Sequence, residues 1–350
     1  MDCYRPSKLY LQNNLIFEGY SPSWQQEQYS GEVVFSTGMT GYPESLTDPS
    51  YKGQILAFTY PLIGNFGVPA SEHWESHKIH AAGVIVSEVC RNWSHHTGTH
   101  SFLEWLKEQN VPLICGVDTR ALTKILRDQG SALGVISSED KITLKYVDPN
   151  AAHLVSQVTV GQPISYKTGE KTVIVVDCGA KENILRALAA FPIHIKRVPY
   201  NYDFTHEPFD AVLLSNGPGD PQQCLETVQI VKKAMLHNKP IFGICLGTQI
   251  MALAAGATTY KLQFGHRGHN QPVKDTQSGR CYITSQNHGY AVDEKTLPPD
   301  WTVNFRNIND GSVEGVAHKT KPFFSVQFHP EATPGPTDTE WLFQKFHELL

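Results

Sequence analysis

The sequence is first informative through what it lacks. No apolar run among its 350 residues reaches the roughly eighteen residues that a membrane-spanning helix needs. The polar first ten residues carry Asp2, Arg5 and Lys8, and they therefore lack the apolar core of a signal peptide. Seven scattered cysteines are an odd number and do not form the pattern of a disulfide-bonded scaffold. These absences predict a soluble, cytoplasmic protein that makes no contact with a membrane.

A basic surface and a phosphate-binding loop are also missing. The formal net charge of −5 gives no electrostatic footprint for nucleic acid, so we expect no nucleic-acid partner. No G-x-x-x-x-G-K motif followed by Ser or Thr is present, so we expect no cofactor in this chain. His73 and His77 have a spacing that a metal site could use, but neither an H-E-x-x-H motif nor a cysteine pair accompanies them. We interpret them as solvated surface residues and predict no metal site.

The length of the chain and a change in its pattern predict two domains. Residues 1–150 have the pattern of a mixed α/β domain, and the polar stretch at 151–170 predicts a linker. Residues 171–350 begin with alternating strands and helices, the first strand being the β-branched run at 172–177. Repeated βα units of this kind predict a doubly wound, flavodoxin-like parallel sheet with helices on both faces.

Turn-forming residues interrupt both predicted domains. A hairpin is expected around Asn13 and Asn14, and the stretch from Thr37 to Tyr51 predicts a long loop, because it is dense in Gly, Pro, Thr, Ser and Asp. After Gly256 we expect shorter strands and a final helix from about residue 337. Those strands are predicted at 281–284, 302–306, 313–317 and 323–328.

The chain is organised around a strand–turn–helix segment with a cysteine at its turn. Residues 240–249 read PIFGICLGTQ, so that Gly243 and Gly247 flank Cys245. This is the thiol counterpart of the G-x-S-x-G nucleophile elbow, where the sharp turn leaves no room for neighbouring side chains. The next helix would direct its positive end towards the thiol and favour the thiolate. A buried, inert cysteine is the plainer alternative, but the flanking glycines favour a nucleophile.

A cysteine nucleophile needs a base and a group that orients the base. His329 follows the predicted strand at 323–328, and Glu331 lies two residues further on. A carboxylate at that spacing can accept the Nδ1–H of the imidazole and leave Nε2 facing the thiol. Taken alone, the pair could equally be an ordinary histidine and glutamate on the surface.

Acyl transfer also needs hydrogen-bond donors where the oxyanion develops. The N–H of Leu246 is the standard first donor of an elbow. The loop at 216–221 can supply a second, because Gly217 and Gly219 allow main-chain N–H groups to approach a ligand. An ordinary tight turn is the alternative for this loop.

These motifs together resemble the three signatures of class I, or triad, glutamine amidotransferase domains. The resemblance rests on residues 243–247, 216–221 and 329–331. It implies hydrolysis of the side-chain amide of glutamine through a thioester on Cys245, with His329 and Glu331 completing the catalytic triad. The ammonia would be passed on to a second reaction.

The N-terminal half is similar to the small subunit of carbamoyl-phosphate synthetase. That family makes carbamoyl phosphate from glutamine, bicarbonate and ATP for arginine and pyrimidine biosynthesis. The resemblance implies a large partner subunit, in a heterodimer or a higher oligomer, that carries ATP and Mg²⁺. The matching segments are GEVVF at 31–35, TGYPE at 40–44, LTDPSY at 46–51, TYPLIGN at 59–65, GVDTR at 116–120 and SQNHGY at 285–290.

The resemblance also implies which residues contact L-glutamine. They are Ser50, Gly217, Gly219, Leu246, Gln249, Asn287, Gly289 and Tyr290. The family elbow usually has histidine where this chain has Thr248, and this departure puts catalytic efficiency in question. A free-standing thiol amidase or peptidase of the same fold is the alternative function, but it would not explain the N-terminal half. A non-catalytic binding module would be expected to lack a triad residue, and all three are present.

Overall fold

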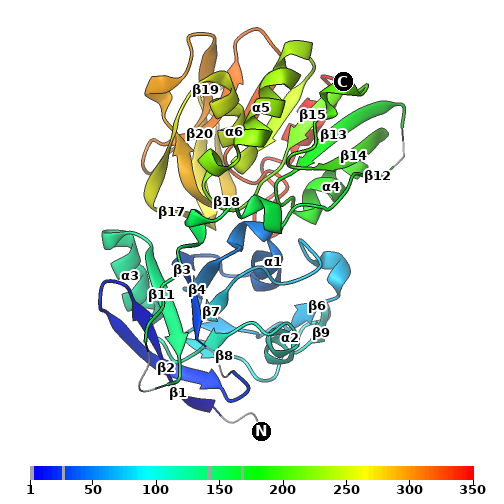
Figure 1. Ribbon diagram of the computed structural model, residues 1–350. Coiled ribbons are helices and arrows are strands. Elements are labelled where there is room, and N and C mark those ends of the chain that lie inside the picture. The colour runs from blue at the N-terminus through cyan, green and yellow to red at the C-terminus, as the bar shows by residue number, and fades with distance from the viewer. Residues whose placement is uncertain (1–3, 26–27, 140–142, 167–168) are drawn as a thin grey trace. The chain divides into compact units, whose positions relative to one another are not determined.

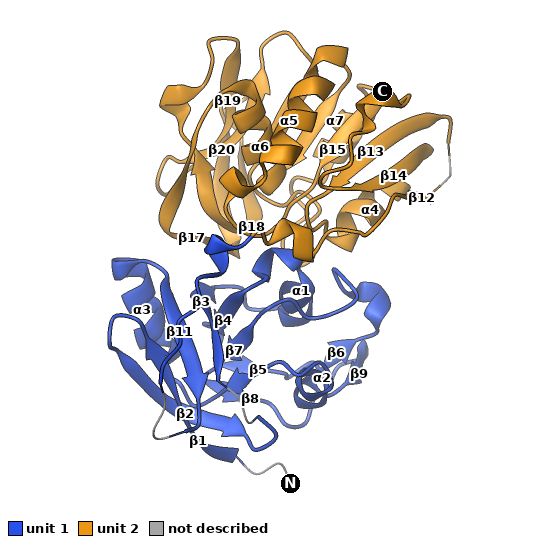
Figure 2. Cartoon of the chain, in the orientation of Figure 1, with its two compact units in different colours: residues 1–152 blue, residues 153–350 orange. Residues whose placement is uncertain are grey.

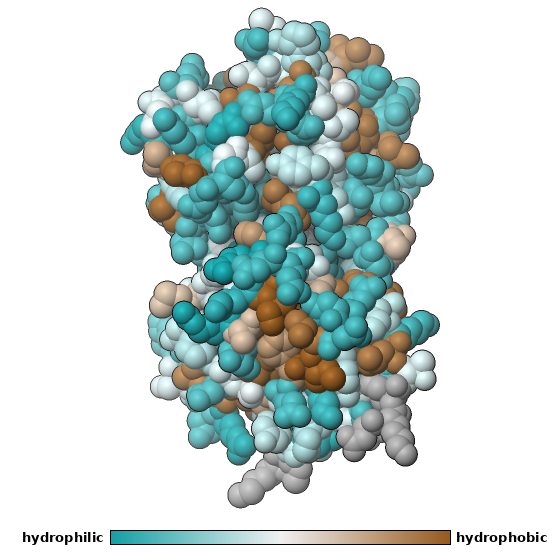
Figure 3. Space-filling view, turned by 90° about the vertical axis from the view of Figure 1, so that its left-hand side faces the viewer, coloured by the Kyte–Doolittle hydropathy of each residue, from teal (hydrophilic) through white to brown (hydrophobic). Residues whose placement is uncertain are grey.

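The computed structural model describes residues 4–25, 28–139, 143–166 and 169–350. The chain divides into two compact units, residues 1–152 and 153–350 (Figure 2). Each unit has its own sheet and its own buried apolar clusters. Within the described residues, no helix is long and apolar enough to cross a membrane. Figure 3 shows one face, on which apolar residues lie among hydrophilic ones.

The first unit contains a seven-stranded mixed sheet (Figure 1). Four of its strands are mutually parallel, and the hairpin expected around Asn13 and Asn14 lies at one edge. Helices α2 (Phe102–Glu108) and α3 (Thr119–Gln129) pack on it. From edge to edge, the strands are β10 (Leu113–Ile114), β7 (Gly83–Ile85), β4 (Gln54–Phe58), β3 (Tyr29–Ser36), β11 (Ala132–Ser137), β1 (Tyr4–Leu11) and β2 (Ile16–Pro22). Two small pairs add β5 (Leu62–Ile63) with β8 (Glu88–Val89), and β6 (Val68–Pro69) with β9 (Gly98–His100).

The long loop predicted at 37–51 is wrong, because this stretch contains helix α1 (Tyr42–Thr47) and a 3₁₀ turn. Tyr42 and Leu46 lie one helical turn apart and are both buried, which stabilises the short helix against the core. The carboxylate of Asp48 then accepts a hydrogen bond from the N–H of Ser50 at 2.8 Å and starts the 3₁₀ turn. The many turn-forming residues therefore cap short helical turns here.

The second unit contains a ten-stranded sheet whose central strands are parallel. These are β14 (Ile193–Pro199), β13 (Lys171–Asp177), β15 (Ala211–Leu214), β16 (Ile241–Ile244) and β21 (Phe323–Val326). Antiparallel strands extend it on both sides: β12 (Ile164–Tyr166) at one edge, and β20 (Val313–His318), β19 (Trp301–Asn307), β17 (Thr259–Asp275) and β18 (Cys281–Val292) at the other.

Helices cover both faces of the parallel strands, which confirms the doubly wound fold (Figure 1). Helices α5 (Leu225–Ala234) and α6 (Leu246–Ala255) pack with Ile174 and Val176 on one face. Helices α4 (Glu182–Ala189) and α7 (Trp341–His347) pack with Val173 and Val175 on the other. Alternate residues of a single strand thus enter two different cores, which explains the unbroken apolar run in the sequence.

Two parts of the second unit differ from the sequence-based expectation. In the predicted linker, residues 153–166 belong to the second unit: β12 pairs with β14, and the Thr159 hydroxyl donates to the Asp177 carbonyl at 2.6 Å. After Gly256, β17 was not predicted and β18 is much longer than 281–284. These two strands form an antiparallel ribbon with register shifts, so their polar sequence has no regular alternation for a pattern to reveal.

Candidate active site

The cysteine of the predicted elbow lies between a strand and a helix. β16 ends at Ile244 and α6 begins at Leu246, and Cys245 between them has φ 54° and ψ −105°, a conformation that L-residues rarely adopt. Hydrogen bonds hold it there. Its N–H donates to the Val326 carbonyl at 2.8 Å, and its own carbonyl accepts from the Thr248 N–H at 3.0 Å. The strained turn places the thiol at the carboxyl end of the parallel strands.

Close packing requires both glycines of the elbow. A Cβ added to Gly243 would lie 2.8 Å from the carbonyl carbon of Gly247. A Cβ added to Gly247 would lie 2.3 Å from the carbonyl oxygen of Leu214. Backbone atoms cannot move aside as flexible side chains can, so no larger residue fits at either position. The structure has the tight turn that the two glycines predict.

His329 and Glu331 form a buried pair beside the cysteine. The His329 Nδ1 lies 2.6 Å from the Glu331 Oε1, and both side chains are almost fully buried. Burial alone would lower the pKa of His329, but the Glu331 carboxylate and the Cys245 thiol outweigh it and raise this pKa to about 10. Among the described residues, the buried Nε2 has no hydrogen-bond partner of good geometry. The imidazole is therefore oriented through Nδ1, and its Nε2 remains for proton transfer.

Lys181 is a functional candidate that the sequence analysis missed. Its Nζ lies 3.0 Å from the Glu331 Oε1 and donates to the Ala332 carbonyl at 2.6 Å, with only 3% of the side chain exposed. Burial opposes ionisation of Glu331, but the charges of Lys181 and His329 outweigh it and lower the pKa of that carboxyl. The lysine therefore keeps Glu331 ionised. The sequence signal that could have revealed Lys181 is its position shortly after β13, because ligands bind at the carboxyl ends of parallel strands.

Lys181→Met is expected to act on the chemistry as well as on stability. Removing one partner of a buried ion pair costs about 3–5 kcal/mol. Because the cation lowers the pKa of Glu331, its loss should raise that pKa and move the acid limb of the pH–rate profile for glutamine hydrolysis to higher pH. A matched control is Lys233→Met, since Lys233 pairs with Asp203 at an exposed site where a salt bridge contributes little. A fall in thermal stability with no shift of the profile would limit Lys181 to a structural role.

The predicted oxyanion loop lies beside the elbow. β15 pairs in parallel with β16, so the loop that follows it, at 216–221, shares one edge of the sheet with Cys245. A Cβ on Gly217 would lie 2.2 Å from the Cys178 carbonyl, and Gly219 has a left-handed φ of 88°. The N–H of Leu246 is the first of α6 and has no acceptor within the helix. Their role as oxyanion donors remains a prediction.

Three predicted glutamine contacts lie on β18, next to the elbow. The Asn287 carbonyl is 3.6 Å from the Cys245 Sγ, and the Tyr290 carbonyl accepts a hydrogen bond from the Gln249 Nε2 at 2.9 Å. Gly289 lies between them in the sequence. The side-chain amide of Gln249 therefore anchors this strand to α6, an arrangement that the sequence could not indicate. Whether it also contacts glutamine remains a prediction.

Ser50 belongs to the first unit. It lies in the 3₁₀ turn at Pro49–Tyr51 and is 5% exposed. Its role as a glutamine contact likewise remains a prediction.

Thr248 occupies the position where the family usually has histidine, and it is fully buried. Its hydroxyl donates to the Val326 carbonyl at 2.6 Å, the same carbonyl that accepts from the N–H of Cys245. The threonine thus ties the first turn of α6 to β21. This hydrogen bond is a structural reason for a threonine at position 248.

Thr248→His is expected to lower turnover, because a larger ring must displace packed neighbours at a cost of about 1–3 kcal/mol. Thr248→Ser is the matched control, since it keeps the hydroxyl, and it should retain most of the turnover. The measurements are turnover at saturating glutamine and melting temperature. Faster turnover in the histidine variant, without loss of stability, would show that threonine weakens the elbow.

The fold and the Cys–His–Glu arrangement define a class I glutamine amidotransferase domain. The family model for glutamine amidotransferase class-I matches residues 174–349, and the model for the carbamoyl-phosphate synthase small chain, CPSase domain, matches residues 9–136. The chain therefore belongs to the carbamoyl-phosphate synthase small-chain family.

Similar proteins occur both as separate small chains and within larger polypeptides. The chain is 49% identical to the carbamoyl phosphate synthase arginine-specific small chain of Aspergillus niger, over 95% of this chain and 77% of that one. It is 50% identical to the multifunctional protein CAD of Squalus acanthias over 91% of this chain, but it spans only 15% of that protein. For the multifunctional protein ura1 of Schizosaccharomyces pombe, the identity is 45% over 100% of this chain and 17% of the relative.

Proposed function

We propose that the chain is the glutaminase component of a glutamine-hydrolysing carbamoyl-phosphate synthetase. The observation that carries the proposal is the buried His329–Glu331 pair, held at 2.6 Å beside a cysteine on a strained elbow. The family membership of both halves of the chain supports it. In this reaction, L-glutamine and water give L-glutamate and ammonia.

The geometry suggests a two-stage acyl transfer. The Nε2 of His329 takes the proton of Cys245, and the thiolate attacks the side-chain amide carbon of glutamine. The N–H of Leu246 and the loop at 216–221 would stabilise the oxyanion that forms. The imidazolium then gives its proton to the departing nitrogen, which leaves as ammonia, and a thioester remains. Water, deprotonated by His329, attacks the thioester and releases glutamate and the thiol.

The remaining predicted site residues would bind and orient glutamine. Asn287, Gly289 and Tyr290 are presented by β18 next to the nucleophile, and Gln249 holds that strand through the Tyr290 carbonyl. Ser50 is proposed as a further contact to glutamine. This positioning keeps the amide carbon within reach of the thiol, which is where oriented binding accelerates a reaction most.

A large synthetase partner would use the ammonia. That partner would carry the ATP and Mg²⁺ sites and combine ammonia with bicarbonate, either as a separate chain in a heterodimer or a higher oligomer, or as part of one polypeptide. Relatives named as arginine-specific small chains and as multifunctional proteins support both arrangements. The pathway served would be arginine biosynthesis, pyrimidine biosynthesis or both, in the cytoplasm.

Capture of the partner from the native source tests this function. The tagged chain should retain a large ATP-dependent synthetase, and its glutamine turnover should rise at least about tenfold with the partner, some 1.4 kcal/mol of barrier. The physical reason is that ammonia released without a consumer is lost to water as ammonium, so a site that is fully active only in the complex is favoured. Full activity of the isolated chain, with no synthetase captured, would instead favour a free-standing thiol hydrolase.

A further inference from the structure

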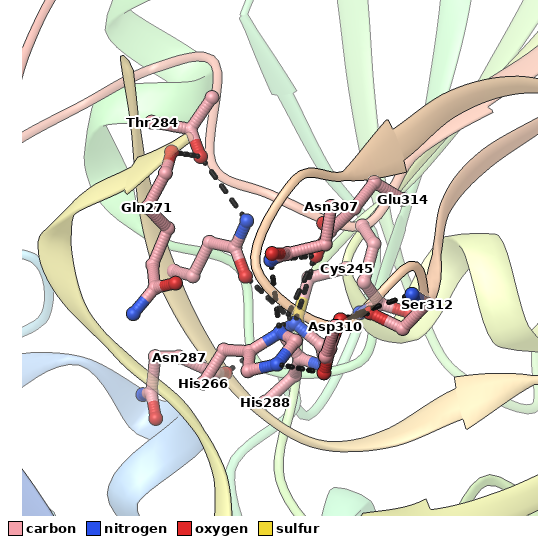
Figure 4. Close-up of polar contacts among 12 residues, drawn as sticks. Cys245, His266, Gln271, Thr284, Asn287, His288, Asn307, Asp310, Ser312 and Glu314 are labelled. Carbon is pink, nitrogen blue, oxygen red and sulfur yellow. Dashed lines mark hydrogen bonds and ion pairs between the residues drawn. The ribbon is translucent and has the colours of Figure 1, made fainter. Parts of the chain in front are cut away.

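A second group of buried titratable side chains lies among the antiparallel strands of the second unit (Figure 4). His266 on β17 and His288 on β18 are directly opposite each other in the strand register, and Glu314 comes from β20. Their exposed fractions are 7%, 5% and 0%. One ligand atom from each of the three lies within 4.8 Å of the others. The proposed glutaminase chemistry uses none of these three side chains.

The inward-facing atoms have the spacing of a metal coordination shell. The Glu314 Oε1 lies 3.3 Å from the His266 Nδ1 and 4.0 Å from the His288 Nε2. The Gln286 Oε1, also buried, lies 3.0 Å from the same His288 Nε2. Around a tetrahedral ion with bonds of about 2.0–2.1 Å, neighbouring ligand atoms are separated by about 3.3 Å. The 3.3 Å and 3.0 Å distances match this spacing, and the 4.0 Å distance would have to shorten when an ion binds.

The second ring nitrogen of each histidine, the one that faces away from Glu314, also has a polar partner. The His266 Nε2 lies 2.9 Å from the Asp310 Oδ2 (Figure 4). The His288 Nδ1 lies 2.9 Å from the Tyr290 carbonyl. Metal-bound histidines characteristically use their second nitrogen in this way, which fixes the ring orientation. Among the described residues, the second carboxylate oxygen of Glu314 is buried without a hydrogen-bond partner.

Protons alone satisfy this cluster poorly. Both ring nitrogens of His288 face an oxygen atom, so hydrogen bonding on both sides would require a doubly protonated imidazole. The His266 Nε2 faces the Asp310 carboxylate, and its Nδ1 lies 3.3 Å from the Glu314 Oε1 and 3.5 Å from the Asn307 Nδ2. The ring centres of His266 and His288 are only 4.9 Å apart, so a positive charge on His266 opposes the second proton that His288 would need. Turning the Gln286 amide round does not remove the conflict, because its Nε2 donates to the Thr284 hydroxyl, which itself donates to the Gln271 carbonyl.

We propose that His266, His288 and Glu314, with Gln286 as a fourth ligand, bind a divalent transition-metal ion such as Zn²⁺. Two nitrogen and two oxygen donors suit Zn²⁺, whereas Mg²⁺ and Ca²⁺ prefer oxygen alone. A closed shell of four protein ligands makes this a structural site, which would join β17, β18 and β20. The side chain of Asp310, which contacts His266, is half-exposed, so one edge of the cluster lies next to solvent. The sequence does not predict the site, since its ligands come from separate strands with no compact motif.

The same ion would influence the glutaminase site, and this consequence alone rests on the proposed function. The Tyr290 carbonyl accepts from both the His288 Nδ1 and the Gln249 Nε2, so one carbonyl joins the metal cluster to helix α6. Asn287, whose carbonyl faces the Cys245 thiol, directly precedes His288. Metal binding itself can be measured without any glutamine, so the two proposals can fail independently.

Metal titration of the chelator-treated protein tests the site. We expect one equivalent of Zn²⁺ or Co²⁺ to bind, and the melting temperature to rise by about 5 °C or more at a hundredfold excess over Kd. The Co²⁺ form should have the visible bands of a four-coordinate nitrogen and oxygen site. A thiolate-to-cobalt band would instead assign the ion to cysteine. Absence of stoichiometric binding would overturn the proposal and leave an ion-pair network held by protons.

Matched variants locate the ion. Glu314→Gln should weaken binding at least about a hundredfold, and Asp310→Asn about tenfold to a hundredfold, because it removes a supporting hydrogen bond. His318→Gln is the control: His318 is paired with Asp300 at 2.9 Å and does not belong to the cluster of His266, His288 and Glu314, so its loss should leave metal binding unchanged. If Glu314→Gln does not fold, the half-exposed Asp310 still decides the question. Unchanged affinity in the Asp310 variant would contradict the site.

Discussion

Cys245→Ser is expected to reduce glutamine hydrolysis by on the order of a thousandfold or more. The alcohol ionises far less readily than the thiol, so it does not supply the anion that attacks the amide at neutral pH. The substitution is nearly isosteric, and the strained turn is held by main-chain hydrogen bonds to Val326 and Thr248 that serine retains. Glutamate release at saturating glutamine measures the effect, and calorimetry should show that glutamine still binds.

Another cysteine provides the control for loss of a thiol. Cys281→Ser should keep the wild-type rate, because this cysteine is exposed on β18 and lies outside the proposed machinery. Cys224 is a weaker candidate for the nucleophile than Cys281, since burial raises the pKa of its thiol to about 12. Glutaminase activity above a trace in the Cys245 variant, with Cys281→Ser fully active, would remove Cys245 as the nucleophile.

The sequence could predict the features that are determined by residues close together in the chain. Gly243 and Gly247 reveal the elbow because backbone atoms occupy the space of their missing side chains. The spacing of His329 and Glu331 reveals the pair because two residues suffice to bring Nδ1 and Oε1 together. The parallel sheet follows from β-branched runs that alternate between two cores.

The features that it could not predict depend on partners distant in the chain. Lys181 has the appearance of a surface lysine before a helix, and only the fold brings it to Glu331. The sequence of β17 is too polar and too irregular to be recognised as a strand. This segment is extended because it pairs with β18. His266, His288 and Glu314 are unremarkable in the sequence until three strands place them together. In each case the role of the residue or strand depends on tertiary contacts, and no local sequence pattern predicts those contacts.

His329→Asn and Glu331→Gln are expected to separate proton transfer from orientation. The histidine variant should lose on the order of a thousandfold in kcat/KM, because no other group in the described site can move the proton between thiol and ammonia. The glutamate variant should lose less, about tenfold to a hundredfold. Its amide oxygen can still accept from Nδ1, but it no longer stabilises the positive charge of the imidazolium.

The pH dependence of Glu331→Gln gives the sharper test of this division. In the folded protein the pKa of His329 is raised to about 10, above the ordinary value of about 6.5 for histidine. The stabilisation of the imidazolium is therefore fully present below pH of about 6.5 and is lost as pH rises towards 10. Without the carboxylate this pKa should fall, and the alkaline limb of the kcat/KM profile should move to lower pH. Asp300→Asn is the control, since it removes the same kind of carboxylate from His318 at a site away from the cysteine. Equal and complete loss of activity in both triad variants, with the fold intact by circular dichroism, would mean that Glu331 takes part in proton transfer itself.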